Sequence, residues 1–186
     1  MGLFRISERL PWLWGVKPDA AWLQRTIATV PEGSRVAIRA IQTTAEAQQL
    51  FRWLCQLRRA PYSYDWIDNF GRRSPRDPDD SLVTSLAVGQ TMMTIFTLTD
   101  YERPEVLSMQ MKPGLPRWLF GEIRLDYEIE AAPNGQQWLR AIMIMAPVAG
   151  PLANLRRYLL AWGDVVMMRK QLHTLRALAE RTPTAA

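Results

Sequence analysis

The sequence predicts an α+β fold in which a curled antiparallel sheet closes around one long C-terminal helix. Within residues 92–146 lie segments whose apolar and polar side chains mostly alternate, which is the period of a half-buried strand. Residues 152–181 instead repeat their apolar side chains at helical spacing. Asn134-Gly135 lies between two of the predicted strands and is a strong hairpin signal, so we expect consecutive strands to run antiparallel.

Length and composition are those of one folded domain. The chain has 186 residues, 48% of them hydrophobic and 22% charged, which suits a single sizeable core. It also has eight tryptophans, and such large rings either fill a core or line a cavity for a ligand. We expect most of them to pack in the core.

The net charge of +5 does not predict nucleic acid as a partner. A nucleic-acid surface needs a basic stripe with aromatic residues between the charges. The basic residues here are spread along the chain, and the arginines within residues 58–76 stand among aspartates that cancel most of their field. We therefore expect no nucleic acid among the partners.

The residue types that carry common reactions are sparse. Cys55 is the only cysteine and His173 the only histidine, so no disulfide framework and no pair with metal-ligand spacing is present. A Ser-His-Asp triad would have to use His173, which we interpret as a surface or groove residue instead. The glycines are isolated and form no phosphate loop. We expect no metal and no cofactor.

No segment of the sequence predicts a membrane crossing. The chain has no run of 18 apolar residues, which a transmembrane helix needs. Arg5, Glu8 and Arg9 interrupt the apolar residues at its start, where a signal peptide needs a continuous apolar stretch. We expect the cytoplasm as the location.

The N-terminal part consists of an arm and a short helix. Residues 3–16 mix apolar and charged side chains without a clear period, and we expect Trp12 and Trp14 to dock on the core of the domain. Peripheral contact of this arm with a membrane is the alternative. Pro18 opens a short helix, which Pro31-Glu32-Gly33 ends.

A strand and a helix follow the arm. Residues 34–42 alternate as a strand, with Arg35 and Arg39 on its polar face. Thr43-Thr44-Ala45-Glu46 has the spacing of a capping box, which predicts the start of a helix. That helix should end before Pro61.

Residues 61–76 combine aromatic rings, carboxylates and arginines, and we expect them to close one end of the sheet. Residues 64–70 predict a short helix in which Asp68 bonds to Arg72 or to backbone N–H groups. Residues 74–90 are rich in Pro, Asp and Ser, which predicts a loop with at most a short strand near residues 82–86.

Four alternating segments then form most of the sheet: residues 92–101, 106–112, 122–131 and 138–146. Each segment except the last has one polar face, so we expect the sheet to be covered on one side only. The side chains predicted to point inward are Leu107, Met109, Met111, Ile123, Leu125, Tyr127, Ile129, Ile142 and Ile144.

The C-terminal helix changes its apolar face near Met168. Its first half places Leu155, Tyr158, Leu159, Trp162, Val165 and Val166 on one face, and its second half places Met168, Leu172, Leu175 and Ala179 on another. We interpret the first half as the cover of a cavity of roughly a few hundred Å³, with Tyr127 and Trp162 on its wall. The second half should anchor the helix on the sheet.

This order of elements is that of the helix-grip fold, and several segments resemble the START-like (SRPBCC) superfamily. They are Gly15, Pro31-Glu32-Gly33, residues 53–57 (Trp-Leu-Cys-Gln-Leu), residues 62–69 (Tyr-Ser-Tyr-Asp-Trp-Ile-Asp-Asn) and residues 86–90 (Leu-Ala-Val-Gly-Gln). The likeness is to bacterial polyketide cyclase/dehydrase-like members of unassigned function. It implies a ligand-binding domain over residues 34–182, preceded by the arm and short helix over residues 1–33.

The resemblance implies that this domain binds, carries or senses a hydrophobic small molecule, such as a lipid or a polyketide, in an internal apolar cavity. The ligand-binding residues expected on this basis are Tyr62, Tyr64, Trp66, Asn69, Met109, Leu125, Tyr127, Ile142, Leu159, Trp162 and Val166. The alternative is an enzyme of the polyketide cyclase or aromatase type, with Tyr64, Asp65 and Tyr127 as its polar groups. An interaction module that uses the aromatic arm is a third interpretation. The sequence leaves open whether the protein is an enzyme, and also its oligomeric state.

Overall fold

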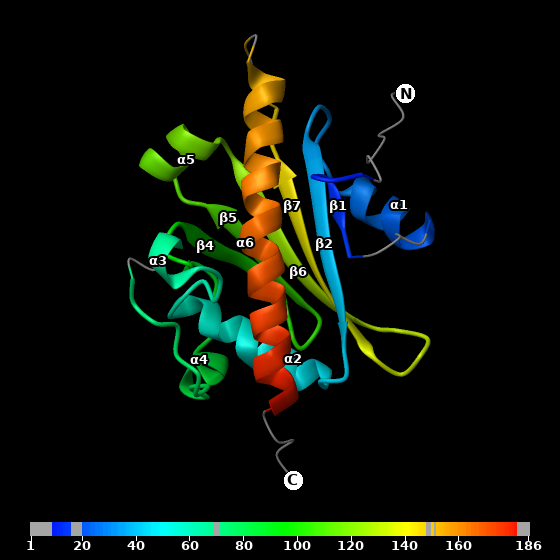
Figure 1. The fold of residues 1–186 in the computed structure, drawn as a ribbon, viewed down its shortest axis with the longest axis vertical. Helices are drawn as coiled ribbons and strands as arrows, with labels where there is room; N and C mark the ends of the chain where they lie inside the picture. Colours follow the sequence, from blue (N-terminus) through cyan, green and yellow to red (C-terminus); the bar gives the residue numbers. More distant parts are fainter. Residues whose placement is uncertain (1–8, 16–19, 69–70, 148–149, 151, 182–186) are drawn as a thin grey trace.

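A computed structural model of the chain describes residues 9–15, 20–68, 71–147, 150 and 152–181, and all statements below concern these residues. Within them, seven strands form one curled sheet in the order β1-β2-β7-β6-β5-β4-β3. The strands are β1 (Leu13–Trp14), β2 (Arg35–Thr43), β3 (Thr91–Met92), β4 (Phe96–Glu102), β5 (Val106–Met111), β6 (Ile123–Ala131) and β7 (Gln137–Met145). The helix α6 (Ala153–Arg181) lies across this sheet (Figure 1). The predicted α+β helix-grip fold is confirmed.

All neighbouring strands in the part of the sheet ordered β2-β7-β6-β5-β4-β3 pair antiparallel, as the sequence predicts. The exception is β1, which pairs in parallel with β2 by setting Leu13 opposite Ile38. The N-terminal segment therefore extends the edge of the sheet. Trp12 and Trp14 pack against the core, which confirms the predicted docking for the described residues 9–15. The rest of the predicted arm, residues 3–8, lies outside the described residues.

The remaining helices surround the sheet. They are α1 (Ala20–Ala28), α2 (Ala47–Cys55) with its 3₁₀ extension η1 (Gln56–Arg58), α3 (Asp65–Asp68), α4 (Ser81–Thr84) and α5 (Leu115–Phe120). The short strand predicted near residues 82–86 is wrong, because α4 occupies that segment. Just before α4, the Asp79 carboxylate forms a turn by accepting hydrogen bonds from the Ser81 N–H at 3.0 Å and from the Ser81 hydroxyl at 2.6 Å.

The predicted capping box of α2 is also wrong. Glu46 is the N-cap residue and makes no side-chain cap bond. Thr43 instead accepts a hydrogen bond from the Ala45 N–H at 3.1 Å and donates its hydroxyl proton to Glu180 at 2.9 Å. The end of β2 is thereby tied to the last turn of α6 rather than to α2.

The strand predicted over residues 92–101 is divided into two strands by a tight turn. Met93 and Thr94 have φ angles of 43° and 66°, the left-handed region that side chains other than glycine seldom adopt. The turn is held by the Met93 N–H, which donates to Leu57 O at 2.8 Å, and by the Lys112 ammonium, which donates to Thr94 O at 2.8 Å. No Gly or Asn marks it in the sequence, so the break was not predictable from turn residues.

Two apolar layers cover the two faces of the sheet. The larger lies on the inner face, between the sheet, α2 and α6. The smaller lies on the outer face under α1, and consists of Leu13, Trp22, Val36, Ile38, Ile142 and Ile144. Trp22 fixes α1 there by donating its indole N–H to Glu128 at 2.8 Å. The expectation of a sheet covered on one side only is wrong for β2 and β7.

The C-terminal half of α6 anchors the helix as predicted. Met168, Leu172, Leu175 and Ala179 are all buried, and α6 packs there against β2 and α2. The N-terminal half differs, because most of its large apolar side chains are exposed. That half is the one that adjoins the candidate site.

Candidate ligand-binding cavity

A cavity of about 930 Å³ lies between the N-terminal half of α6 and the inner face of the sheet. Its volume falls at the upper end of the range of small-molecule sites. Its walls come from the loop at residues 61–63, from the turn between β3 and β4, from the inner faces of β4 to β7, from α5 and from one side of α6 with the residue before it. The lining residues are Pro61, Ser63, Met93, Thr94, Ile95, Phe96, Met111, Phe120, Ile123, Leu125, Met143, Leu152, Leu155, Arg156, Leu159, Leu160, Gly163, Asp164, Met167, Met168 and Gln171.

The walls are predominantly apolar and flexible in shape. The sheet contributes Met111, Leu125 and Met143, and α6 adds Met167 and Met168. Methionine side chains are unbranched and polarizable, so they adjust to contents of different shape. Gly163 leaves a gap in the helix wall, since a Cβ added there would meet no atom within 4 Å. The cavity therefore suits a bulky apolar molecule better than a small polar one.

A buried ion pair lies at the wall formed by α6. Asp164 lines the cavity, and its Oδ2 lies 2.9 Å from Nη2 of Arg39, whose side chain is only 1% exposed. Arg39 extends from the inner face of β2. It also donates to the carbonyl oxygens of Trp12, Ile38 and Ala161, at 3.0–3.2 Å. Arg39 is thus held by four partners, while the Asp164 carboxylate keeps a side turned to the cavity, with 14% of its side chain exposed.

Burial raises the pKa of the Asp164 carboxyl to about 6, because the charged form loses its hydration. The Arg39 guanidinium opposes this rise by stabilising the carboxylate. Near neutral pH the group is consequently poised between two roles. As a carboxylate it accepts hydrogen bonds from a ligand hydroxyl or amine, and as an acid it donates one to a ligand carbonyl.

A second polar group in the cavity is Gln171, one turn further along α6 from Met167. Its amide nitrogen donates to Pro61 O at 2.5 Å and contacts the Met93 sulfur at 3.2 Å. Its amide oxygen accepts the hydrogen bond of the Tyr127 hydroxyl. Gln171 thereby ties the turn at residues 61–63 and the turn at residues 93–94 to the helix, and it closes this end of the cavity.

Three residues with strained, left-handed backbone conformations lie at this same closed end of the cavity. Tyr62 has a φ of 57°, and the left-handed Met93 and Thr94 lie at the cavity wall. Such conformations cost about 1–3 kcal/mol each and persist only where the surroundings impose them. Here the bonds of Gln171 and Lys112 impose them. The geometry of the closed end is therefore fixed before any ligand enters.

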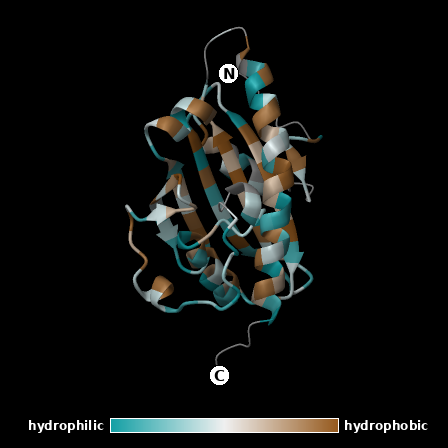
Figure 2. Ribbon diagram, turned by 60° about the vertical axis from the view of Figure 1, so that its left-hand side comes forward, coloured by the Kyte–Doolittle hydropathy of each residue, from teal (hydrophilic) through white to brown (hydrophobic). Residues whose placement is uncertain are grey.

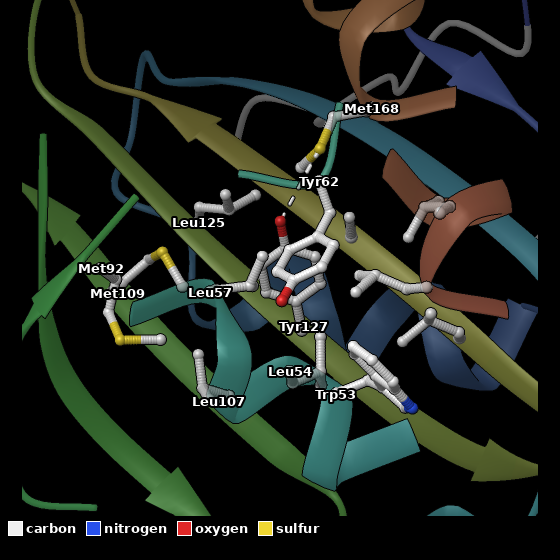
Figure 3. Packing of buried hydrophobic residues seen from close by; sticks show 14 of the residues in the cluster. Trp53, Leu54, Leu57, Tyr62, Met92, Leu107, Met109, Leu125, Tyr127 and Met168 are labelled. Carbon is white, nitrogen blue, oxygen red and sulfur yellow. Dashed lines mark hydrogen bonds between the residues drawn. The ribbon is translucent and has the colours of Figure 1, made fainter. Parts of the chain in front are cut away.

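Two of the predicted ligand-binding residues, Leu125 and Leu159, line the cavity. Three others, Tyr62, Met109 and Tyr127, are almost fully buried in the core behind its wall and do not line it. Figure 3 shows Tyr62 and Tyr127 among Trp53, Leu54 and Met168. Tyr127 acts on the cavity indirectly, through its hydrogen bond to Gln171. The expectation that Tyr127 lies on the cavity wall is wrong, because Tyr127 lies one layer of side chains behind that wall.

The predicted site residues of the 61–76 stretch do not line the cavity. Trp66 is 76% exposed on α3, and Tyr64 is half-buried beside it. Asp65 accepts hydrogen bonds from the Ser74 N–H at 3.1 Å and from its hydroxyl at 2.5 Å, which closes a loop. This segment meets the cavity through Pro61 and Ser63 instead. Asn69 and the side chain of Asp68 lie outside the described residues.

Three further predicted residues, Ile142, Trp162 and Val166, do not line the cavity either. Ile142 lies on the outer face of β7 under α1, together with Ile144, so the inward side chains of β7 include Met143. Both faces of β7 are apolar and buried, and the sequence therefore does not distinguish them. Trp162 and Val166 are exposed, because the side of α6 that faces the cavity is rotated by about one residue, or about 100°, from the apolar stripe.

The sequence analysis missed the polar members of the site, Asp164, Arg39 and Gln171. A signal was present in the pattern. Arg39 interrupts an apolar strand and Asp164 interrupts an apolar stretch of helix, and a buried charge requires a partner of opposite sign. Pairing these two would have placed α6 against β2 with the correct face inward.

Two other reactive residue types stand apart from the cavity. Cys55 is buried, and burial raises the pKa of its thiol to about 12, so the thiolate is not available as a nucleophile. His173 packs edge-on against Trp14, and burial together with Arg176 lowers its pKa. Among the described residues, no cluster of three or more His, Cys, Asp or Glu side chains is arranged to hold a metal. In the described part of the chain, no helix is both long and apolar enough to cross a membrane.

Comparison with solved structures gives similar folds at low identity. A protein from Mesorhizobium loti, MLL2253, is 15% identical over 81% of this chain and all of its own, with a TM-score of 0.50. The ZhuI aromatase/cyclase from Streptomyces sp. R1128 is 13% identical over 80% of this chain and 94% of its own, with a TM-score of 0.49. The Aha1 dimer from Colwellia psychrerythraea is 14% identical over 73% of this chain and 92% of its own, with a TM-score of 0.40.

These likenesses concern the fold alone. No family model matches the sequence, and no curated protein matches it. The resemblance to START-like proteins is thus confirmed as a resemblance of fold, through the curled sheet and the long C-terminal helix.

Proposed function

We propose that this protein binds a hydrophobic small molecule in the cavity between α6 and the sheet, in order to carry or sense it. The single observation that supports this most is an apolar cavity of about 930 Å³ with a charged pair at its wall. Apolar surface transferred from water gains about 25 cal/mol per Å². A ligand with a large apolar body therefore gains most of its binding free energy from the methionine and leucine walls.

The polar groups restrict the ligand further. Asp164 faces the cavity, so a ligand with a hydroxyl, amine or carbonyl group at the matching position gains a hydrogen bond there. A purely aliphatic ligand removes water from the cavity side of the Asp164 carboxylate and offers no hydrogen bond in exchange, which is costly even though Arg39 still pairs with that carboxylate. We therefore propose an amphipathic ligand, with an apolar body and one polar group, such as a lipid or a polyketide.

Filling the cavity from within tests this proposal. The neutral dye prodan should bind the wild-type protein with a blue-shifted emission, and a long-chain alcohol should displace it. Gly163→Trp places a ring in the open space of the helix wall and should abolish dye binding. Val166→Trp adds the same ring on the exposed face, outside the lining residues, and should leave binding unchanged.

Circular dichroism and a thermal melt should verify that both variants fold, and Gly163→Leu serves as a smaller filler if the tryptophan is not accommodated. Equal dye binding by the wild type and a folded Gly163 filler variant contradicts the proposal, because the dye then binds elsewhere.

A second candidate function is a polyketide cyclase or aromatase reaction in the same cavity. The observation that favours it is Asp164, whose carboxyl has a pKa of about 6 and lines an apolar chamber. A general acid with a pKa near the working pH protonates a ketone oxygen efficiently as a carbon–carbon bond forms. Asp164 takes this role in place of Tyr64 and Asp65, which do not line the cavity. Cyclisation of a poly-β-ketone that Asp164→Asn abolishes, while prodan still binds, would support it.

The location and the partner stay predictions from the sequence. We keep the cytoplasm as the expected location and a hydrophobic small molecule as the expected partner. Both functions use the same cavity, and they differ in whether the ligand leaves it chemically unchanged.

A further inference from the structure

Among the described residues, ten exposed apolar side chains lie on α5, on the N-terminal half of α6 and at residue 152 just before it. On α6, Leu155, Leu159, Trp162 and Val166 repeat at helical spacing and form one exposed stripe. The complete set, here called the α5–α6 face, is Leu115, Trp118, Leu119, Phe120, Leu152, Leu155, Tyr158, Leu159, Trp162 and Val166. Contiguous apolar surface of this kind marks an interaction site in folded proteins.

The two helices present one surface rather than two. Arg156 of α6 donates hydrogen bonds to the carbonyl oxygens of Trp118, at 2.9 Å, and of Leu119. Phe120, Leu152 and Leu155 contribute both to the exposed set and to the cavity lining. Figure 2 shows hydrophobic colouring on α5 and on the upper turns of α6, which lie together at one end of the molecule. The α5–α6 face therefore borders the cavity.

The charges around this face are mainly positive. Residues 115–122 and 152–170 contain four basic side chains that are not buried, Arg117, Arg156, Arg169 and Lys170, and two acidic side chains, Glu122 and Asp164. Asp164 is paired with Arg39 from the core. Arg169 and Lys170 are exposed where the apolar stripe ends, and Arg117 lies on α5 beside Trp118 with Glu122 as its partner.

We infer that the α5–α6 face docks on a lipid bilayer that contains anionic lipids. A helix face with Trp, Leu and Val flanked by Arg and Lys is the composition that settles at a membrane interface. Two copies packed face to face would bring their arginines and lysines together, which disfavours a second copy as the occupant. Docking places this side of the cavity against the bilayer, so an apolar ligand enters without crossing water. This inference goes beyond the proposed function, since it concerns the surface and not the contents of the cavity.

Vesicle flotation of the full chain tests the inference. The wild type should float with vesicles of phosphatidylcholine and phosphatidylglycerol, and less with vesicles of phosphatidylcholine alone. The reason is that each basic residue near an anionic surface raises the membrane affinity roughly several-fold. Leu115→Ser combined with Trp118→Ser should lower the bound fraction by at least about tenfold, because two large apolar anchors are lost. Neither residue lines the cavity, so prodan binding should stay unchanged.

Trp66→Ser is the matched control, because Trp66 on α3 is as exposed as Trp118. It should float like the wild type. Failure of the wild type to float overturns the inference, and so does an equal loss in the Trp66 variant. Sedimentation velocity tests self-association as the other use of this face. If the wild type does not float and is a dimer, while Leu115→Ser/Trp118→Ser is a monomer, the face serves self-association instead. If a variant loses prodan binding but still floats, the result bears on the proposed ligand binding and not on membrane docking.

Discussion

The two halves of α6 use their large apolar residues in opposite ways. In the C-terminal half, Leu172 and Leu175 point into the core between β2 and α2 and are almost fully buried. In the N-terminal half, Leu155, Leu159 and Val166 are more than half exposed, although Leu155 and Leu159 also border the cavity that Gly163 and Asp164 line. An apolar stripe on a helix thus indicates that the stripe has a partner, but not that the partner belongs to the same chain.

The difference has a physical cause in what lies opposite each half. The C-terminal half meets side chains of α2 and β2 that fill the space between the elements. The N-terminal half stands opposite an unfilled cavity, with the Arg39–Asp164 pair joining it to the sheet. Stability is therefore concentrated in one half, and the surfaces available to ligands and partners are concentrated in the other.

The largest expected effect is a contrast in stability between the halves. Leu172→Ala removes a fully buried side chain and should lower the free energy of unfolding by about 2–5 kcal/mol. Val166→Ala removes an exposed one and should change it by no more than about 0.5 kcal/mol. Urea unfolding followed by circular dichroism measures both. Similar losses in the two variants would remove the distinction between the halves.

A smaller effect concerns Asp164, where the two halves meet. Its pKa is about 6 in the folded protein and higher than in the unfolded chain, so the folded state binds the extra proton. The contribution of Asp164 to the free energy of unfolding is therefore largest below about pH 4 and should fall, by up to about 3 kcal/mol, as the pH rises through 6.

Asp164→Asn lacks this titration, so the difference between the two proteins isolates it from other groups such as Glu128, whose pKa burial also raises. Unfolding free energies at several values between pH 4 and 7 give the comparison. Parallel pH curves for the two proteins would mean that the carboxyl is not desolvated in the folded state.

The smallest expected effect is at Gly163. A glycine in a helix interior costs about 0.5–1 kcal/mol relative to alanine, and a Cβ here meets open space. Gly163→Ala should raise the free energy of unfolding by about that amount, measured by the same urea titration. A loss of stability would show that the cavity side of the helix is packed more tightly than the open space around Gly163 indicates.

The sequence predicted the order of elements more reliably than it predicted which face of each element points inward. Strands β5 and β6 were predicted to have one polar face, and there the inward residues Leu107, Leu125 and Ile129 were identified correctly. The same method placed Ile142 and Ile144 on the wrong face of β7, because α1 covers the outside of that strand with a second apolar layer. Binary patterns carry no information where both faces are buried.

The remaining errors arise from interactions between distant residues. The left-handed turn at Met93 and Thr94 depends on hydrogen bonds to Leu57 and Lys112, and the sequence has no Gly or Asn there that would predict a turn. The cavity itself depends on the position of α6, which is held by the packing of its C-terminal half and by the Arg39–Asp164 pair, whose members are more than a hundred residues apart in sequence. The candidate site was therefore predicted as an apolar chamber, while its polar members were not.

Photoaffinity labelling tests the central claim, that the cavity under the N-terminal half of α6 holds an apolar ligand. A long-chain alcohol carrying an aliphatic diazirine would be bound to the wild-type protein, photolysed and mapped by peptide mass spectrometry. The account predicts labels on the lining residues Leu125, Met143 and Met167, and their loss in Gly163→Trp. Labels confined to the outer residues Ile142 and Ile144 or to the exposed Trp162 and Val166, unchanged in that variant, would contradict it.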